Sequence, residues 1–261
     1  MNKDLLMTYE QYKAARPGYV PYTYIIEKDG QYIYYFGSRH SFDPNDPQFG
    51  ELDKFFNDFL SKTNGKDRIV LIEGGNWQIM ENKERAIIEC SEAGYGAYLA
   101  AQADIQRTSP EPKDVMRFAE LSKNFSREEI VFFEFALAMY QWHRLTEKKD
   151  IREYVQPFLD MIQVKTKWDD VDFSFEHMQE LQKNWYGVEF DPNNTQFYYN
   201  LVDPTQNNGV TNRISKFEDT GFRDRYILGE IEKYWNEGKS IFIIYGATHA
   251  VMQEPAIRSL I

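Results

Sequence analysis

The chain has 261 residues, of which 42% are hydrophobic and 27% charged, so its composition is that of a globular protein and excludes a largely disordered one. Its formal net charge is −11, and no basic cluster is present to pair with phosphates, which excludes nucleic acid as a partner. The single cysteine, Cys90, excludes an internal disulfide.

The first residues, 1–13, contain no apolar stretch long enough for a signal peptide. No window of about 18 apolar residues occurs anywhere in the chain, so no membrane span is expected. These two observations predict a cytoplasmic location. The oligomeric state is left open by the sequence.

The first predicted elements are two β-type runs, residues 22–28 and 31–36, on either side of Asp29 and Gly30. Asp-Gly between two such runs is typical of a hairpin, because a type I′ turn needs a positive φ at both central positions. The sequence therefore predicts an N-terminal β-hairpin.

Helix and strand patterns then alternate: a helix over 50–62, a strand over 68–73, a helix over 81–103, and a short strand before the break at 104–112. The strand pattern is a continuous apolar run, which is typical of a strand buried on both faces. Gly94 and Gly96 interrupt the longer helix, and they predict either a kink or the close approach of another backbone or a ligand.

Residues 113–185 carry helical patterns almost throughout. Ser126 and Glu129 have the spacing of a capping box, which predicts the start of a helix. Two further helices are predicted, at about 150–164 and 173–185. Residues 186–220 are rich in Asn, Asp, Gly and Pro, and they predict a long loop region.

A helix over 222–237 and a strand over 240–245 complete the pattern. Strands that alternate with helices favour a mostly parallel central sheet flanked by helices. We therefore predict a single α/β domain over residues 1–261, with an N-terminal β-hairpin and with residues 113–185 as a helical insertion or cap.

Three polar side chains directly follow predicted strands: His40 in "FGSRH", Glu73 in "VLIE" and His249 in "YGATH". In open α/β sheets, ligands bind beyond the carboxyl ends of the strands, so these side chains are expected to converge on one crevice. Composition alone predicts about a quarter of one Gly-x-x-His, whereas this chain places two of them after β-type runs. The alternative is that both histidines only cap strand ends by bonding to loop backbone.

Arg223 and Asp224 fall in the first turn of the helix over 222–237, near the ligand end of the sheet if this helix runs antiparallel to the strands. An arginine there would bind a carboxylate, a phosphate or the oxyanion of a transition state. The alternative is a solvated basic turn formed with Arg225.

The segments "FGSRH", "LIEGG", "RDRYI" and "YGATH", in this order and context, resemble the superfamily of erythromycin esterase, the haem-uptake protein ChaN and the TraB/PrgY/Tiki proteins. Gly37 stands where the esterase branch has an acidic residue, so the resemblance is nearer to the Gly-x-x-His motif of the Tiki and TraB branch. The four segments bracket residues 33–252, and the helical middle resembles no known pattern.

The resemblance implies a sheet flanked by helices with one site built from two motif-like halves. It also implies ester hydrolysis as in the esterases, metal-dependent peptide cleavage as proposed for Tiki, or haem or iron binding as in ChaN-like members. Carried over to this chain, it implies a site of His40, Glu73, Arg223 and His249.

Two imidazoles and a carboxylate suit two kinds of chemistry. In the first, His40, Glu73 and His249 hold one Zn²⁺, Mn²⁺ or Fe²⁺ with open coordination positions. Such a divalent metal is expected as the cofactor in preference to haem. Without a metal, one histidine would act as general base on water, Glu73 would orient it and Arg223 would stabilise the oxyanion. We expect a hydrolase of an ester or an amide or peptide bond in a small molecule or peptide. The alternative is a non-catalytic protein that binds haem, a metal or a small ligand.

Asp224, Arg107 and Glu111 are predicted to bind the substrate, and the last two follow a predicted strand end. Residues 75–82 and 196–200 would supply aromatic walls or a lid. No Gly-x-Ser-x-Gly elbow occurs, so a serine nucleophile is not expected.

Two further groups of residues are weaker candidates. Glu89 and Glu92 lie near Gly94, where they would either approach the site or, as we favour, form a solvated helix face. His143 and His177 lie in helical patterns and are expected to be surface or core residues rather than ligands.

Overall fold

The computed structural model describes residues 1–15, 18–75, 77–145 and 148–261. This part of the chain divides into two compact units. The sheet unit combines Met1–Pro112 with Arg223–Ile261, and the helical unit is Lys113–Phe222. The sheet unit is thus built from two segments that the helical unit separates in the sequence.

The sheet unit has strands between helices. The hairpin, the strands predicted over 68–73 and 240–245 and the helices predicted over 50–62, 81–103 and 222–237 lie close to those positions, whereas the elements over 3–5, 9–15 and 247–258 were not predicted. Its elements are, in chain order, η1 (Lys3–Leu5), α1 (Tyr9–Ala15), β1 (Tyr22–Lys28), β2 (Gln31–Ser38), α2 (Pro47–Lys62), β3 (Arg68–Ile72), α3 (Lys83–Gln102), β4 (Gln106–Thr108), α10 (Asp224–Asn236), β5 (Ser240–Gly246) and α11 (Ala247–Arg258).

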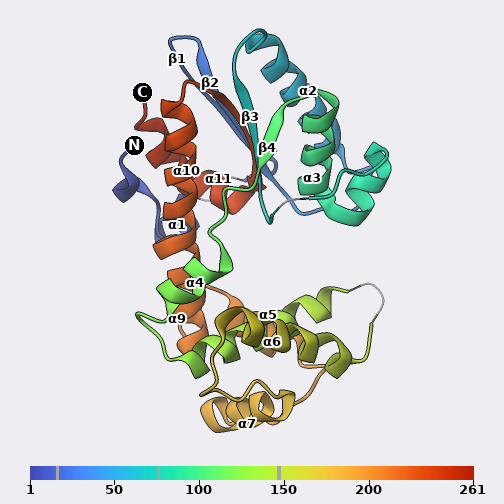
Figure 1. The fold of residues 1–261 in the computed structure, drawn as a ribbon, viewed down its shortest axis with the longest axis vertical. Helices are drawn as coiled ribbons and strands as arrows, with labels where there is room; N and C mark the ends of the chain where they lie inside the picture. The colour runs from blue at the N-terminus through green and yellow to red at the C-terminus, as the bar shows by residue number, and fades with distance from the viewer. Residues whose placement is uncertain (16–17, 76, 146–147) are drawn as a thin grey trace. The chain divides into compact units, whose positions relative to one another are not determined.

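The strands form one sheet in the order β1-β2-β5-β3-β4. The hairpin pair β1–β2 is antiparallel, and the other neighbours in the sheet are parallel. Asp29 and Gly30 have φ values of 55° and 78°, as the predicted hairpin turn requires. The predicted α/β fold, a mostly parallel sheet flanked by helices with an N-terminal hairpin, is confirmed (Figure 1).

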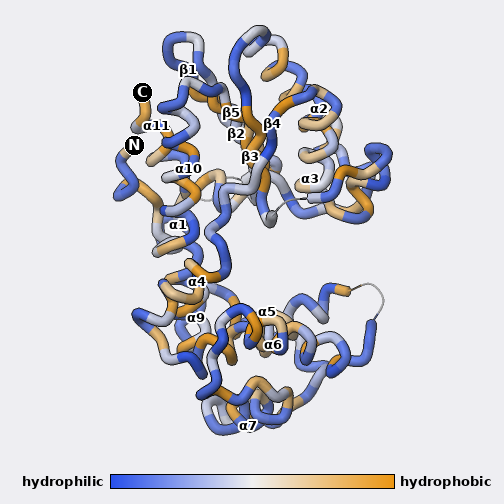
Figure 2. Tube along the Cα trace, viewed as in Figure 1, coloured by the Kyte–Doolittle hydropathy of each residue, from blue (hydrophilic) through white to orange (hydrophobic). Residues whose placement is uncertain are grey.

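Both faces of the sheet are covered by apolar side chains. Along β3, Val70 and Ile72 belong to a cluster shared with α2 and α3, whereas Ile69 and Leu71 belong to a cluster shared with α10 and α11. All four side chains are at most 2% exposed. Figure 2 shows the hydrophobic residues gathered along the central strands. The continuous apolar run of β3 therefore reflects burial on both faces, as predicted.

The helical unit is built around one hydrophobic cluster of its own. Ser126 and Glu129 form the predicted capping box at the start of α5. Within the described ranges, no helix of either unit is long and apolar enough to cross a membrane. The helices of this unit are α4 (Asp114–Leu121), α5 (Arg127–Arg144), α6 (Ile151–Thr166), α7 (Phe175–Tyr186), α8 (Thr195–Val202) and α9 (Val210–Lys216), followed by a π-helical segment, η2 (Phe217–Arg223).

The prediction of a long loop over 186–220 is wrong, because α8, α9 and most of η2 lie there. The polar residues that suggested a loop serve instead at helix ends: the Asn194 side chain accepts a hydrogen bond from the Phe197 N–H at the start of α8. Tyr198 and Ile214 then bury their side chains in the cluster of the unit. The helical region consequently extends to residue 222 instead of ending at 185.

The interruption in α3 lies at Ser91, not at the predicted Gly94 or Gly96. Ser91 has φ 53° and ψ −148°, which is a non-helical conformation inside an otherwise continuous helix. Gly96 serves close packing, because a Cβ at this position would collide with the Ile244 side chain of β5. The turn at Ser91 directly precedes Glu92, whose side chain is 2% exposed.

Candidate functional site

The candidate site lies at the carboxyl ends of three adjacent parallel strands. His40 follows β2 and His249 follows β5, and these strands pair with Ser38 opposite Gly246. Glu73 follows β3, and its N–H donates to the Ile244 carbonyl of β5 at 3.1 Å. Since β5 lies between β2 and β3, the three predicted residues follow the carboxyl ends of neighbouring strands. They therefore lie along one edge of the sheet, the one formed by these strand ends.

Glu73 occupies the centre of this edge. Its Oε2 accepts a hydrogen bond from the Gly246 N–H at 2.7 Å, and its Oε1 accepts one from Arg223 Nη2 at 3.0 Å. Burial would raise the pKa of Glu73, but the positive charges of His249, Arg223 and His40 outweigh it and lower this pKa to about 2. Glu73 is therefore ionised throughout the physiological pH range.

His249 is held by a buried carboxylate. Its Nδ1 lies 2.8 Å from Asp224 Oδ1, and the same oxygen accepts a hydrogen bond from Gln253 Nε2 at 2.8 Å. Burial would lower the pKa of His249, but Asp224 and Glu73 outweigh both burial and Arg223 and raise this pKa to about 9. The Nε2 atom lies 2.9 Å from Arg223 Nη1 and 3.7 Å from Glu73 Oε1.

These distances give the His249 ring two alternative partners. A carboxylate only accepts, so Nδ1 carries a proton toward Asp224. In the neutral ring Nε2 accepts a hydrogen bond from Arg223, whereas in the protonated ring Glu73 Oε1, 3.7 Å away, is an ion-pair partner.

His40 forms a second pair of the same kind. Its Nδ1 lies 2.6 Å from Glu92 Oε1, and the Glu92 side chain comes from α3. A Cβ at Gly246 would lie 3.5 Å from His40 Nε2 and 3.6 Å from Glu73 Oε2, so both atoms border the same small space. Glycine keeps that space open. The His40 side chain is 48% exposed, against 12% for His249, and is the ring that solvent and a ligand reach.

Glu92 is the residue of the site that sequence reasoning missed. We favoured a solvated helix face for Glu89 and Glu92; this is correct for Glu89, which is paired with Arg85 on the surface, and wrong for Glu92. Helical periodicity alone cannot place Glu92, because the non-helical Ser91 changes the direction of the chain immediately before it.

Arg223 connects the remaining carboxylates. Its Nε and Nη2 donate to the two oxygens of Glu111 at 2.8 and 2.7 Å, and the Tyr245 hydroxyl donates to Glu111 at 3.1 Å. Glu111 contacts Arg223 and Asp224 contacts His249, and the predicted role of both carboxylates in substrate binding stays a prediction. Arg223 is a shared partner of Glu73, His249 and Glu111, and its charge is balanced within the protein.

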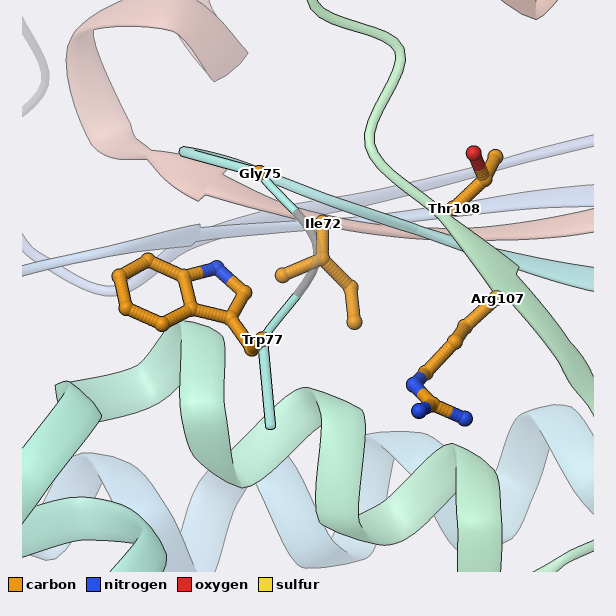
Figure 3. A pocket seen from close by; sticks show the side chains of 5 residues that line it. All are labelled: Ile72, Gly75, Trp77, Arg107 and Thr108. Carbon is orange, nitrogen blue, oxygen red and sulfur yellow. The ribbon is translucent and has the colours of Figure 1, made fainter. Parts of the chain in front are cut away.

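Arg107, the third predicted substrate-binding residue, lies elsewhere on the same edge. It lines a pocket of about 210 Å³ at the ends of β3 and β4, together with Ile72, Gly75, Trp77 and Thr108. Figure 3 shows the Arg107 guanidinium and the Trp77 indole on opposite sides of Ile72.

The two remaining histidines belong to the helical unit. His177 Nε2 lies 3.0 Å from Glu128, and His143 Nδ1 lies 3.1 Å from the Thr195 hydroxyl. Both rings are half-buried on helices and have local partners. Both thus lie on helices, as the sequence pattern predicted.

Both carboxylates that hold a histidine retain a second, buried oxygen. Glu92 Oε2 and Asp224 Oδ2 have no hydrogen-bond partner in the described part of the chain. A buried acceptor without a partner costs on the order of 1–3 kcal/mol. Glu92 and Asp224 thus each contact their histidine through one oxygen, Oε1 and Oδ1 respectively.

The predicted metal ligands do not fit a metal ion in this arrangement. The described residues contain no group of three or more His, Cys, Asp or Glu side chains placed to hold one. Arg223 contacts Glu73 Oε1 and His249 Nε2, and the Gly246 N–H contacts Glu73 Oε2, which are the lone pairs that a metal would need. Metal binding by His40, Glu73 and His249 would require Arg223 to move, and it stays a prediction.

Comparison of the chain with models of protein families, with curated proteins and with solved structures finds no match. The resemblance to the erythromycin esterase, ChaN and TraB/PrgY/Tiki superfamily therefore stays a prediction that rests on four short segments. What the structure adds is the place of those segments: three of them lie at the carboxyl ends of adjacent strands of one sheet, and Arg223 of the fourth contacts Glu73 there.

Proposed function

We propose that the protein hydrolyses an ester or an amide or peptide bond in a small molecule or peptide at the edge formed by His40, Glu73 and His249. The observation that carries the proposal is that two histidine–carboxylate pairs meet one ionised carboxylate: His249 Nε2 lies 3.7 Å from Glu73 Oε1, and His40 Nε2 borders the same small space as Glu73 Oε2. Capping of strand ends explains this less well, because both Nδ1 atoms contact carboxylates and not loop backbone.

His40 is the general base in this proposal. Glu92 accepts the hydrogen bond from Nδ1–H, so Nε2 is the basic nitrogen of the neutral ring, and the ring is exposed enough for water to reach it. General base catalysis of this kind contributes roughly 10²- to 10⁴-fold to a rate. Glu73 orients the water and stabilises the imidazolium that forms.

His249 is the general acid. With a pKa of about 9 its ring is protonated near neutral pH, and its Nε2–H can donate to the leaving group. The water oxygen attacks the carbonyl carbon as His40 takes the water proton. The bond to the leaving oxygen or nitrogen then breaks as His249 gives up its proton, and exchange with solvent restores both rings.

The alternative is a non-catalytic protein that binds a small ligand. One observation favours it: Arg223 contacts Glu73, His249 and Glu111, which leaves its charge balanced instead of directed at an oxyanion. Turnover distinguishes the two functions, since a binding protein converts no substrate.

The test is a screen of ester and peptide substrates with the wild-type protein, His40→Ala and the control His177→Ala, each with chelator and with added Mn²⁺ or Zn²⁺. We expect turnover by wild type and by His177→Ala in chelator, and a loss of at least about 100-fold in kcat/KM for His40→Ala. Equal turnover by all three variants would overturn the proposal. Turnover that appears only with added metal would replace it by the metal-dependent mechanism.

A further inference from the structure

The pocket that contains Arg107 is separate from the hydrogen-bonded cluster around Glu73. It opens where β3 ends at Ile72 and β4 ends at Thr108, and its volume is about 210 Å³. Pockets for whole drug-sized ligands are typically about 300–1,000 Å³. This pocket therefore suits one group of a larger molecule whose remainder extends beyond it.

One wall of the pocket is fixed in place by the chain that carries Glu73. The Trp77 Nε1–H donates to the Glu73 carbonyl at 2.6 Å, and the indole ring packs over Gly74. Gly74 has φ +82°, and a Cβ there would lie 3.0 Å from the Trp77 ring, so glycine permits the contact. The indole thus presents a flat apolar surface with a defined position relative to Glu73.

Arg107 supplies the charge of the pocket. It is the charged residue among the five that line it, and in the described chain it has no ion pair or side-chain hydrogen bond. This differs from Arg223, which has carboxylate partners, in a chain with 41 acidic residues. The nearby Gly75 N–H already donates to Ser109 at 3.0 Å, so the guanidinium remains as the main donor toward a ligand.

We propose that this pocket binds an anionic group, a carboxylate or a phosphate, carried on a flat apolar part of the substrate. The guanidinium offers two parallel N–H donors to such a group, and the indole stacks on the apolar part. Ile72 and Gly75 flank Glu73 in the chain, so the rest of the ligand extends to the edge where Glu73 lies. The binding of the anion stands alone, whereas its role as substrate recognition rests on the proposed hydrolytic function.

The binding test uses benzoate, phenyl phosphate and neutral benzamide as probes, measured by calorimetric titration of the full chain. We expect benzoate or phenyl phosphate to bind more tightly than benzamide, and the tighter of the two shows which anion the pocket prefers. Arg107→Gln should weaken anion binding by about 10- to 100-fold. The matched control Arg127→Gln, on the surface of the helical unit, should bind as wild type does.

Trp77→Ala should weaken both anionic probes, because the stacking wall is lost. Since Arg107 lies on the surface of an edge strand, Arg107→Gln should retain the wild-type melting curve, which separates lost binding from lost folding. Benzamide binding as tightly as benzoate, or anion binding that is unchanged in Arg107→Gln, would overturn the assignment of the pocket.

A second comparison separates this inference from the hydrolytic function. His40→Ala should bind benzoate as wild type does while losing hydrolysis, because its ring does not line the pocket. Arg107→Gln should lose kcat/KM for esters with a carboxylate but not for neutral esters. If the wild type hydrolyses no ester or peptide while Arg107→Gln loses benzoate binding, the pocket stands and the hydrolase proposal fails; normal hydrolysis by His40→Ala would refute the role of His40.

Discussion

At the scale of single residues, His40 and His249 are each paired with a carboxylate but differ in their surroundings. Each Nδ1 contacts a buried carboxylate, yet His249 also faces Arg223 and is nearly enclosed, while His40 is half exposed. The pKa values of His249 and Glu73 are shifted in opposite directions from their usual values, and both shifts affect stability.

The stability of the fold should depend on pH through these two residues. The raised pKa of His249 contributes stability that is fully present below about pH 6.5 and is lost as pH rises to about 9. The lowered pKa of Glu73 contributes stability that is present above about pH 4.5 and is lost as pH falls to about 2. Between pH 6.5 and 9, the free energy of unfolding should fall by on the order of 3 kcal/mol.

Urea denaturation of wild type and Asp224→Asn across this pH range measures the effect. Removing the Asp224 charge removes the main cause of the raised pKa of His249, so the variant should show a much flatter profile between pH 6.5 and 9. Asp170→Asn, an exposed partner of Arg127, should keep the wild-type profile. Parallel profiles for wild type and Asp224→Asn would contradict the role given to this pair.

The sequence predicted part of the site at this scale. His40, Glu73 and His249 follow strands, and the rule for carboxyl ends of parallel strands was sufficient to bring them together. Arg223 was expected to bind a carboxylate, a phosphate or an oxyanion of a ligand, which stays a prediction; in the structure it contacts the protein's own carboxylates of Glu73 and Glu111. Glu92 was not predicted to join them, because its burial depends on one backbone conformation that no hydrophobic pattern encodes.

At the scale of elements, the distinctive feature is the break in α3. The φ and ψ of Ser91, 53° and −148°, lie close to a region that is almost exclusive to glycine, and such conformations cost on the order of 1–3 kcal/mol. The adjoining Glu92 contacts His40. The strain is thus located where it turns a carboxylate toward the candidate site.

Ser91→Gly should therefore raise the free energy of unfolding by about 1 kcal/mol, because glycine adopts this conformation without strain. Ser61→Gly in α2 is the matched control, and it should lower stability by about 0.5 kcal/mol, since an exposed helical position gains nothing from glycine. Chemical denaturation of both variants gives the comparison. Two changes of the same sign would mean that Ser91 is not strained.

At the scale of the whole molecule, the sequence predicted the fold class but not the strand order. Alternation of helix and strand patterns is local and was sufficient for a mostly parallel α/β sheet. The position of β5 between β2 and β3 depends on contacts between residues about 170 to 210 positions apart, such as Ile33 with Ile241 and Leu71 with Ile243. No local pattern carries that information.

This topology makes the two units unequal in their dependence on the rest of the chain. The hydrophobic cluster of the helical unit is formed by residues that lie within 113–222. The sheet of the other unit has its central strand, β5, in the segment after residue 222, so residues 1–112 alone would leave β2 and β3 each with one unpaired side. Unpaired strand edges of this kind are sites of aggregation.

The fragment 113–222 should therefore fold by itself, whereas the fragment 1–112 should not. We expect a helical circular dichroism spectrum with a cooperative thermal transition for 113–222, because its buried side chains find their partners within the fragment. For 1–112 we expect aggregation, which addition of the fragment 223–261 with its β5 strand should reduce. A non-cooperative 113–222, or a soluble and cooperatively folded 1–112, would show that the stability of each unit is not set by its own cluster of apolar side chains.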